Sequence, residues 1–86
     1  MGLYGMEVTL ERHWWNRNTS LRGRRDVYVR SDGEVWEVEA QIGGVDGRSR
    51  VQRCPSLAAA MILAQAWRGT GSEWREVIQP RVPTRG

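Results

Sequence analysis

The sequence contains no lysine and no phenylalanine, and it has one cysteine and one histidine. Cys54 has no second cysteine with which to form an intramolecular disulfide, and Cys54 with His13 is too small a set for a structural zinc site made by protein ligands alone. A Ser–His–Asp arrangement would have to use His13, and no motif places a serine or a carboxylate beside it. We therefore expect a protein that is not an enzyme and carries no metal or cofactor.

The sequence also lacks a long apolar run. No segment of about 20 residues is apolar enough to span a bilayer, and no N-terminal stretch resembles a signal peptide. These absences predict a soluble cytoplasmic protein with no membrane partner. The 86 residues are 40% hydrophobic and 27% charged, which fits one small domain over 1–79 and a flexible, proline-containing tail at 80–86.

The clearest local pattern is a pair of alternating runs around the Asp-Gly pair at 32–33. Asp-Gly between alternating hydrophobic residues predicts a β-hairpin with a two-residue turn. In that register Val29 faces Trp36 and Val27 faces Val38. All four side chains then share the inner face of a sheet.

A third strand is expected over 47–53, after a short glycine-rich loop. The predicted loop length places Val51 opposite Val38 on the inner face and Arg50 opposite Glu39 on the outer face. The arginines of this strand should therefore lie on a solvated face, where glutamates neutralise them.

A helix is predicted next, because 57–67 is rich in alanine and other helix-favouring residues. Pro55 marks its first turn, Cys54 or Ser56 caps it, and Gly69 ends it. A free cysteine at such a helix start gains thiolate character from the helix dipole, but it is more often a packing residue.

Two further segments, 7–11 and 73–78, are candidate strands, and the spacing of apolar residues in 73–78 also fits a helical turn. The fold class is therefore α+β, with a three- or four-stranded antiparallel sheet and one helix packed on one face. Ile62 falls on the side of the helix opposite its core stripe, from which we infer a weak homodimer.

Positive charge is concentrated in residues 12–25, which contain five arginines and no acid, whereas the remaining residues contain eight arginines and ten acids. Arginine binds phosphate, and an indole stacks on an unpaired base for about 1–3 kcal/mol. This segment is therefore the predicted site for nucleic acid or another partner, through Arg12, Trp14, Trp15, Arg17, Arg22, Arg24 and Arg25.

Three interpretations of this segment stay open. It can bind DNA or RNA, it can bind a protein partner, or it can be a solvated loop whose tryptophans fold back over the sheet. The leading function is a small non-enzymatic binding module for nucleic acid. The alternative is a protein-interaction or structural accessory protein that forms a homodimer or docks on a host factor.

Two resemblances accompany these patterns. Arg22-Gly23-Arg24 resembles the Arg-Gly-Arg core of minor-groove hooks, including those of actinobacterial nucleoid-associated proteins, although no proline flanks it. That resemblance implies that Arg22 and Arg24 enter an A·T-rich minor groove. Over 26–77, the Asp-Gly turn, Trp36-Glu37-Val38, Arg48-Ser49-Arg50 and the alanine run resemble small uncharacterised actinobacterial or actinophage proteins with a strand–strand–strand–helix plan. This second resemblance implies no activity.

Overall fold

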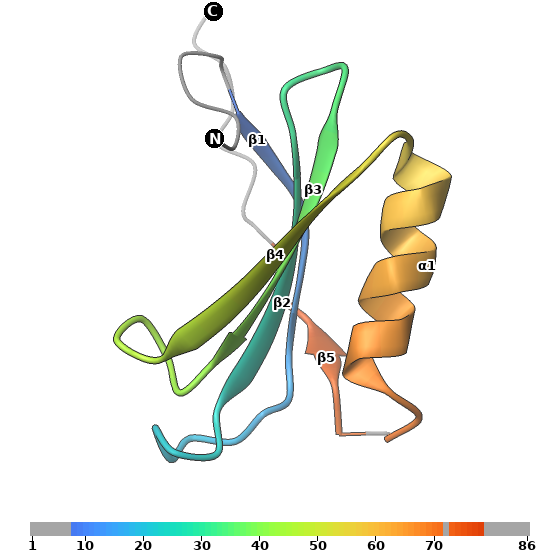
Figure 1. Cartoon of the computed structure of the whole chain (residues 1–86). Coiled ribbons are helices and arrows are strands. Elements are labelled where there is room, and N and C mark those ends of the chain that lie inside the picture. The colour runs from blue at the N-terminus through green and yellow to red at the C-terminus, as the bar shows by residue number, and fades with distance from the viewer. Residues whose placement is uncertain (1–7, 72, 79–86) are drawn as a thin grey trace, which may run out of the picture.

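The computed structural model describes residues 8–71 and 73–78 and contains a five-stranded antiparallel sheet with one helix on one face (Figure 1). In chain order the elements are β1 (Thr9–Trp15), β2 (Arg25–Ser31), β3 (Trp36–Ile42), β4 (Arg48–Cys54), α1 (Leu57–Arg68) and β5 (Arg75–Glu76). The strand order in the sheet is β4-β3-β2-β1-β5. The predicted α+β class is confirmed, with more strands than the three or four expected. The tail predicted at 80–86 lies outside the described residues.

The β2–β3 hairpin keeps its predicted faces but not its predicted turn. Val29 pairs with Val38 rather than with Trp36. The connection runs from Asp32 to Val35 because the Asp32 carboxylate accepts hydrogen bonds from the backbone N–H groups of Glu34 and Val35, both at 2.9 Å, as in an Asx turn. The register moves by an even number of residues, so the hydrophobic side chains stay on the inner face.

The face predicted for β4 is wrong. Val51 pairs with Glu39 on the outer face, and Arg50 pairs with Ala40 on the inner face. The reason is the loop at 43–47, which is one residue longer than predicted because its first two glycines adopt positive φ angles of 90° and 79°. Since strand side chains alternate, this single residue turns the β4 arginines from the outer face to the face that carries the helix.

The helix follows the sequence prediction closely. Ser56 is the N-cap and its side chain accepts a hydrogen bond from the Ala59 backbone N–H, while Gly69 ends the helix with a φ of 78°. Pro55 lies just before the cap rather than in the first turn. Small side chains bring α1 close to β2 and β3, and the buried apolar core consists of Trp14, Val27, Val29, Val38, Cys54, Ala60 and Ala64.

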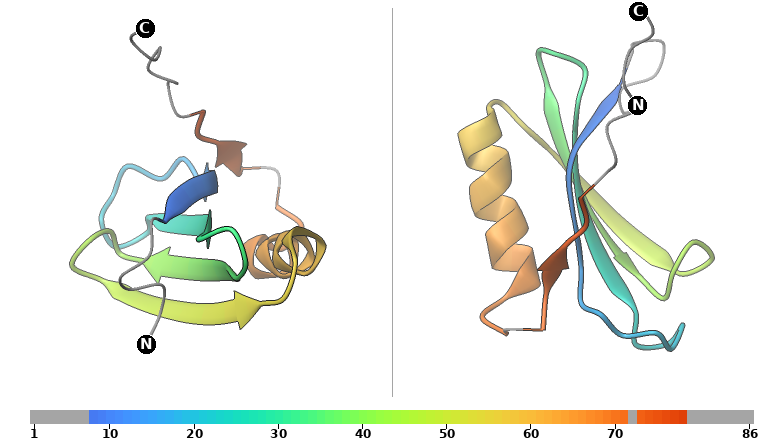
Figure 2. Two further views of the ribbon diagram at one scale, coloured as in Figure 1. Left: turned by 90° about the horizontal axis from the view of Figure 1, so that it is seen from above. Right: turned by 180° about the vertical axis from the view of Figure 1, so that it is seen from behind.

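The helix covers only one face of the sheet, as both views in Figure 2 show. Ile62 is 71% exposed on the outer side of α1, so the weak homodimer inferred from it stays a prediction. In the described part of the chain, no helix is both long and apolar enough to cross a membrane. Burial raises the pKa of the Cys54 thiol, which fits a packing residue rather than a nucleophile.

Candidate functional site

The structure divides the segment 12–25 between the end of β1, the β1–β2 loop and the first residue of β2. The two adjacent tryptophans in β1 point to opposite faces. Trp14 pairs with Val27 on the inner face and is only 4% exposed. Its ring contacts the guanidinium of Arg68 from the helix, 4.1 Å from the ring centre. This placement removes Trp14 from the candidate surface, because its indole is part of the core.

Two of the predicted arginines are neutralised by carboxylates. Arg12 makes a bidentate pair with Glu76 of β5, with its Nη2 atom 2.8 Å from Oε1. This hydrogen bond and the charge of Arg12 hold the pKa of Glu76 below its usual value. Arg24 donates to both carboxylate oxygens of Asp26, at 2.8 and 3.2 Å. The first pair joins β1 to β5, and the second joins the β1–β2 loop to β2. The charges of Arg12 and Arg24 therefore contribute less to a binding surface.

Asp26 also belongs to a buried cluster on the outer face that the sequence did not reveal. It is 1% exposed, and its Oδ2 atom lies 2.8 Å from Nε2 of His13. The His13 ring stacks on Tyr28, with 4.2 Å between ring centroids. Burial by itself raises the pKa of Asp26, but hydrogen bonds from Arg24 and His13 outweigh it and leave this pKa below its usual value. The cluster therefore holds β1 against β2.

The remainder of the segment is a loop ordered by its own hydrogen bonds. The Asn16 side chain donates to the Gly23 carbonyl oxygen at 2.9 Å and accepts from the Arg25 backbone N–H at 3.0 Å. Trp15 is half-buried, and its indole N–H donates to the Asn18 carbonyl oxygen. The loop thus covers part of Trp15, while Arg17 and Arg22 project from it and are exposed.

The β1–β2 and β3–β4 loops meet at one end of the sheet, at the bottom of Figure 1. The Gly43 backbone N–H donates to the Arg24 carbonyl oxygen at 2.8 Å and joins them. At this end Arg25 and Arg48 both pair with Ile42, from its two sides. We call the set formed there the basic end; its members are Arg17, Arg22, Arg25, Arg48 and Arg50.

No member of the basic end has an ion-pair partner within residues 8–71 and 73–78. Three of the five belong to the segment that the sequence singled out. Arg48 and Arg50 do not, and their contribution depends on the loop length that reversed the face of β4. The sequence feature that indicates the inward position of Arg48 and Arg50 is the set of glycines in that loop. Glycine adopts positive φ angles, which permits a longer loop between the two strands.

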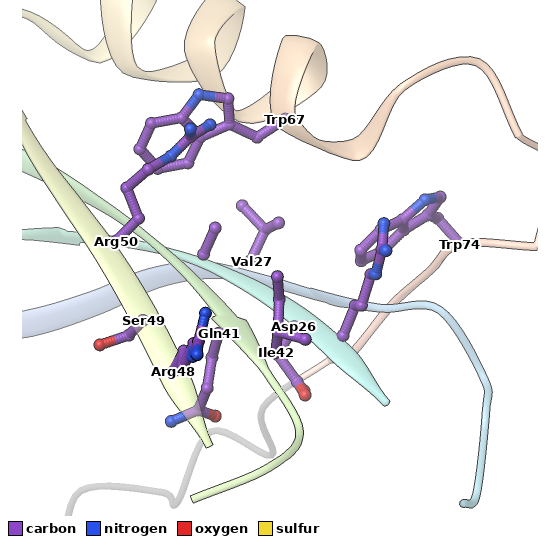
Figure 3. A pocket seen from close by; sticks show the side chains of 11 residues that line it. Asp26, Val27, Gln41, Ile42, Arg48, Ser49, Arg50, Trp67 and Trp74 are labelled. Carbon is purple, nitrogen blue, oxygen red and sulfur yellow. The ribbon is translucent and has the colours of Figure 1, made fainter. Parts of the chain in front are cut away.

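A pocket of about 380 Å³ lies between the sheet and the C-terminal end of α1, next to the basic end (Figure 3). Arg50 reaches from β4 to the indole of Trp67, with its guanidinium carbon 4.2 Å from the ring centroid. Trp74 forms the opposite side of the pocket (Figure 3). Its indole N–H is buried and has no hydrogen-bond partner among the residues that the structure describes. Arg25 and Arg48 complete the charged part of the lining.

The pocket is electropositive despite its position below a helix C-terminus. That helix end carries about half a negative charge, and Arg68 partly offsets it by donating to the Ala64 carbonyl oxygen at 3.1 Å. The positive charges of the three arginines in the lining exceed the negative charge of the helix end. Asp26 also borders the pocket, but its carboxylate is held on the other face by His13 and Arg24.

Comparison of the chain with protein-family models, with curated proteins and with solved structures gives no match. Within the described residues, no group of three or more His, Cys, Asp or Glu side chains is placed to hold a metal ion. The function is therefore inferred from the side chains of the site itself. Guanidinium groups beside indole rings suit a ligand that is both anionic and planar.

Proposed function

We propose that this domain is a small non-enzymatic module that binds nucleic acid through its basic end. The observation that carries the proposal is the convergence of Arg25, Arg48 and Arg50, none paired with a carboxylate in the described residues, beside Trp67 and Trp74. Guanidinium groups donate in pairs to phosphate oxygens, and the aromatic rings offer contacts to bases. Phosphate contacts and counterion release would supply most of the affinity.

The two loop arginines extend this surface beyond the pocket. Arg17 and Arg22 are exposed on the β1–β2 loop, which packs against the β3–β4 loop through the Gly43–Arg24 backbone hydrogen bond. Asp46, in the β3–β4 loop, is the carboxylate closest in sequence to the β4 arginines. The five arginines of the basic end come from the β1–β2 loop and from the adjoining parts of β2 and β4, so a polyanion that follows the surface gains contacts from the loop and from both strands.

The paired side chains support binding rather than catalysis. His13 and Asp26 are buried, and the Asp26 carboxylate is engaged with His13 Nε2 and with the Arg24 guanidinium. A general base needs a free position beside the reacting group, and this pair is closed by the Tyr28 ring. Its role in the proposal is to fix β1 and β2 beneath the binding loops.

Titration with fluorescent oligonucleotides at about 50 mM salt tests the proposal. For three to five arginine contacts, the log–log salt slope should be about −2 to −3.5 with single strands and about −3 to −4.5 with duplexes. Arg25→Ala combined with Arg48→Ala should flatten the single-strand slope by about 1.4. Arg75→Ala is the matched control, because Arg75 pairs with Trp15 and so lies on the opposite face. A flat titration of the natural protein would show that the proposal is wrong.

A protein partner is the second candidate function. Leu21 and Val45 are 72% and 89% exposed on the two loops of the basic end. Exposed apolar side chains beside unpaired arginines suit an acidic partner surface with an apolar centre. This candidate predicts no nucleic-acid binding at low salt and a loss of partner binding in a Leu21→Ser, Val45→Ser variant.

A further inference from the structure

The pocket is lined by aromatic rings and by arginines. The rings match the base of a nucleotide, and the arginines match its phosphate. We propose that the pocket holds one nucleotide, with the base stacked on the Arg50–Trp67 pair and the phosphate between Arg25 and Arg48. The inference rests on the proposed function, since it names the part of a nucleic acid that the pocket takes. It also extends to a free nucleotide, which presents the same chemistry.

The base position follows from the stacking of Arg50 on Trp67. One face of the guanidinium lies against the indole, with 4.2 Å between its carbon and the ring centroid. Arg50 is exposed and lines the pocket, and bases stack on arginine guanidinium planes as well as on aromatic rings. Trp74 borders the same space from the opposite side (Figure 3).

Trp74 brings a second, independent observation. Its indole N–H is buried and finds no hydrogen-bond partner in residues 8–71 and 73–78, and an unsatisfied buried donor is uncommon in a folded protein. The edge of a base carries several hydrogen-bond acceptors. A rotation of the Trp74 ring toward the pocket would let this donor bind one of them.

The phosphate position follows from the register of the three strands. Arg25 and Arg48 pair with Ile42 from either side, so their Cα atoms lie about 10 Å apart across two strand spacings. Long side chains on both sides of that gap can meet at one phosphate. Arg50 lies two residues farther along β4, or roughly 7 Å, which is comparable with the distance from a base to its own phosphate.

The size of the pocket limits the ligand to one nucleotide. Its volume of about 380 Å³ is near the lower end of ligand sites, which span roughly 300–1,000 Å³. In a duplex, each base is already stacked and paired, so its face is not available to Arg50. The site should therefore favour single strands and unpaired bases.

The test compares three labelled probes of equal length at one low salt concentration: an intact single strand, the same strand built from abasic sites, and the matched duplex. The intact and abasic strands carry the same phosphates, so any difference between them reports the base. We expect the intact strand to bind at least about fivefold more tightly than the abasic strand. Arg50→Lys keeps the positive charge but removes the guanidinium plane, so the intact strand should lose more affinity than the abasic strand and the difference between the two should shrink.

A second experiment distinguishes a free nucleotide from a nucleotide within a strand. Binding of adenosine monophosphate and of ribose 5-phosphate is measured by the change in tryptophan fluorescence. Binding of the monophosphate without binding of any oligonucleotide would support the pocket for a free nucleotide and contradict the proposed function. Equal binding of intact and abasic strands would overturn the pocket inference and leave the proposed function standing. The absence of binding to every probe would overturn both. The comparison of probes on the natural protein decides the question even if the variant fails to fold.

Discussion

The guanidinium of Arg50 lies over the indole of Trp67, with its carbon 4.2 Å from the ring centroid. Arg50 comes from the edge strand β4 and Trp67 from the last part of α1, so this cation–π contact joins the two layers at the pocket. Because the contact is made between two residues of the chain itself, these residues hold the stacking surface in place. A ligand that uses it has less side-chain entropy to lose on binding.

The first prediction separates Arg22 from Arg24. A minor-groove hook would use both residues equally, whereas in the structure Arg24 is held by Asp26 and Arg22 is exposed. Arg22→Ala should therefore flatten the salt slope for duplex DNA by about 0.9, and Arg24→Ala should flatten it less. Titrations over a range of salt concentrations measure both slopes. Equal losses would favour the hook.

The second prediction concerns the two adjacent tryptophans. Trp14→Ala should lower the free energy of unfolding by about 3–5 kcal/mol, because Trp14 is 4% exposed and packs in the core. Trp15→Ala is the control; it removes a half-buried ring and should have a much smaller effect. Urea unfolding of both variants measures the difference. Similar losses of stability would contradict the assignment of Trp14 to the core and Trp15 to the loop.

The third prediction is a pH dependence that comes from Asp26. Its pKa is lower in the folded protein than in the unfolded chain, so the stabilisation is fully present above the unfolded pKa of about 4 and is lost as the pH falls through the lower folded value. Asp26→Asn should lower stability at pH 7 by about 1–3 kcal/mol, because it weakens the hydrogen bonds to His13 and Arg24. The Arg24 side chain is 38% exposed, so solvent screening reduces the stability that its pair with Asp26 contributes.

The measurement for Asp26 is thermal unfolding from pH 7 down to about pH 2. The natural protein should lose stability steeply below about pH 4, and the Asp26→Asn variant should lose it less steeply. Glu76 also has a lowered pKa, so some acid dependence should persist in the variant. If stability falls with pH by the same amount in the natural protein and in the variant, then Asp26 does not cause the loss of stability in acid.

The fourth prediction concerns the loop that sets the face of β4. A Cβ atom on Gly47 would lie 1.8 Å from the Ile42 carbonyl oxygen, so Gly47→Ala forces the loop to move. We expect a loss of about 1–3 kcal/mol in the free energy of unfolding, together with weaker single-strand binding as Arg48 shifts. Val45→Ala is the control in the same loop, because Val45 is 89% exposed. A stable Gly47→Ala variant would contradict this loop geometry.

The helix and the two central strands can be predicted from the sequence because the residues that specify them are close together in the chain. Ser56 begins the helix as its N-cap, and Gly69 ends it. The inner and outer faces of β2 and β3 stay the same when the register changes by two residues. The strand β1 was harder to predict, because a bulge between Leu10 and Arg12 breaks the alternation of its side chains. His13 then occupies a buried position that would ordinarily be apolar.

The candidate site was only half predictable for a similar reason. The charge of the segment 12–25 is visible in the sequence, but which arginines are neutralised depends on contacts between distant residues. Glu76 is 64 positions from Arg12, and no local pattern joins them. The partnership of Arg50 with Trp67 depends likewise on the face of β4, which an error of one residue in the loop reverses.

That loop has an evolutionary consequence. Side chains in a strand alternate, so inserting or deleting one residue between β3 and β4 exchanges the two faces of β4, whereas a change of two residues restores them. A single-codon deletion at 43–47 would carry Arg48 and Arg50 away from Trp67 and toward Glu37 and Glu39 without altering any side chain of the strand. Homologous chains could therefore gain or lose the pocket chemistry by length variation alone. In such a lineage the parity of the loop would say more about function than the identity of the residues beside it.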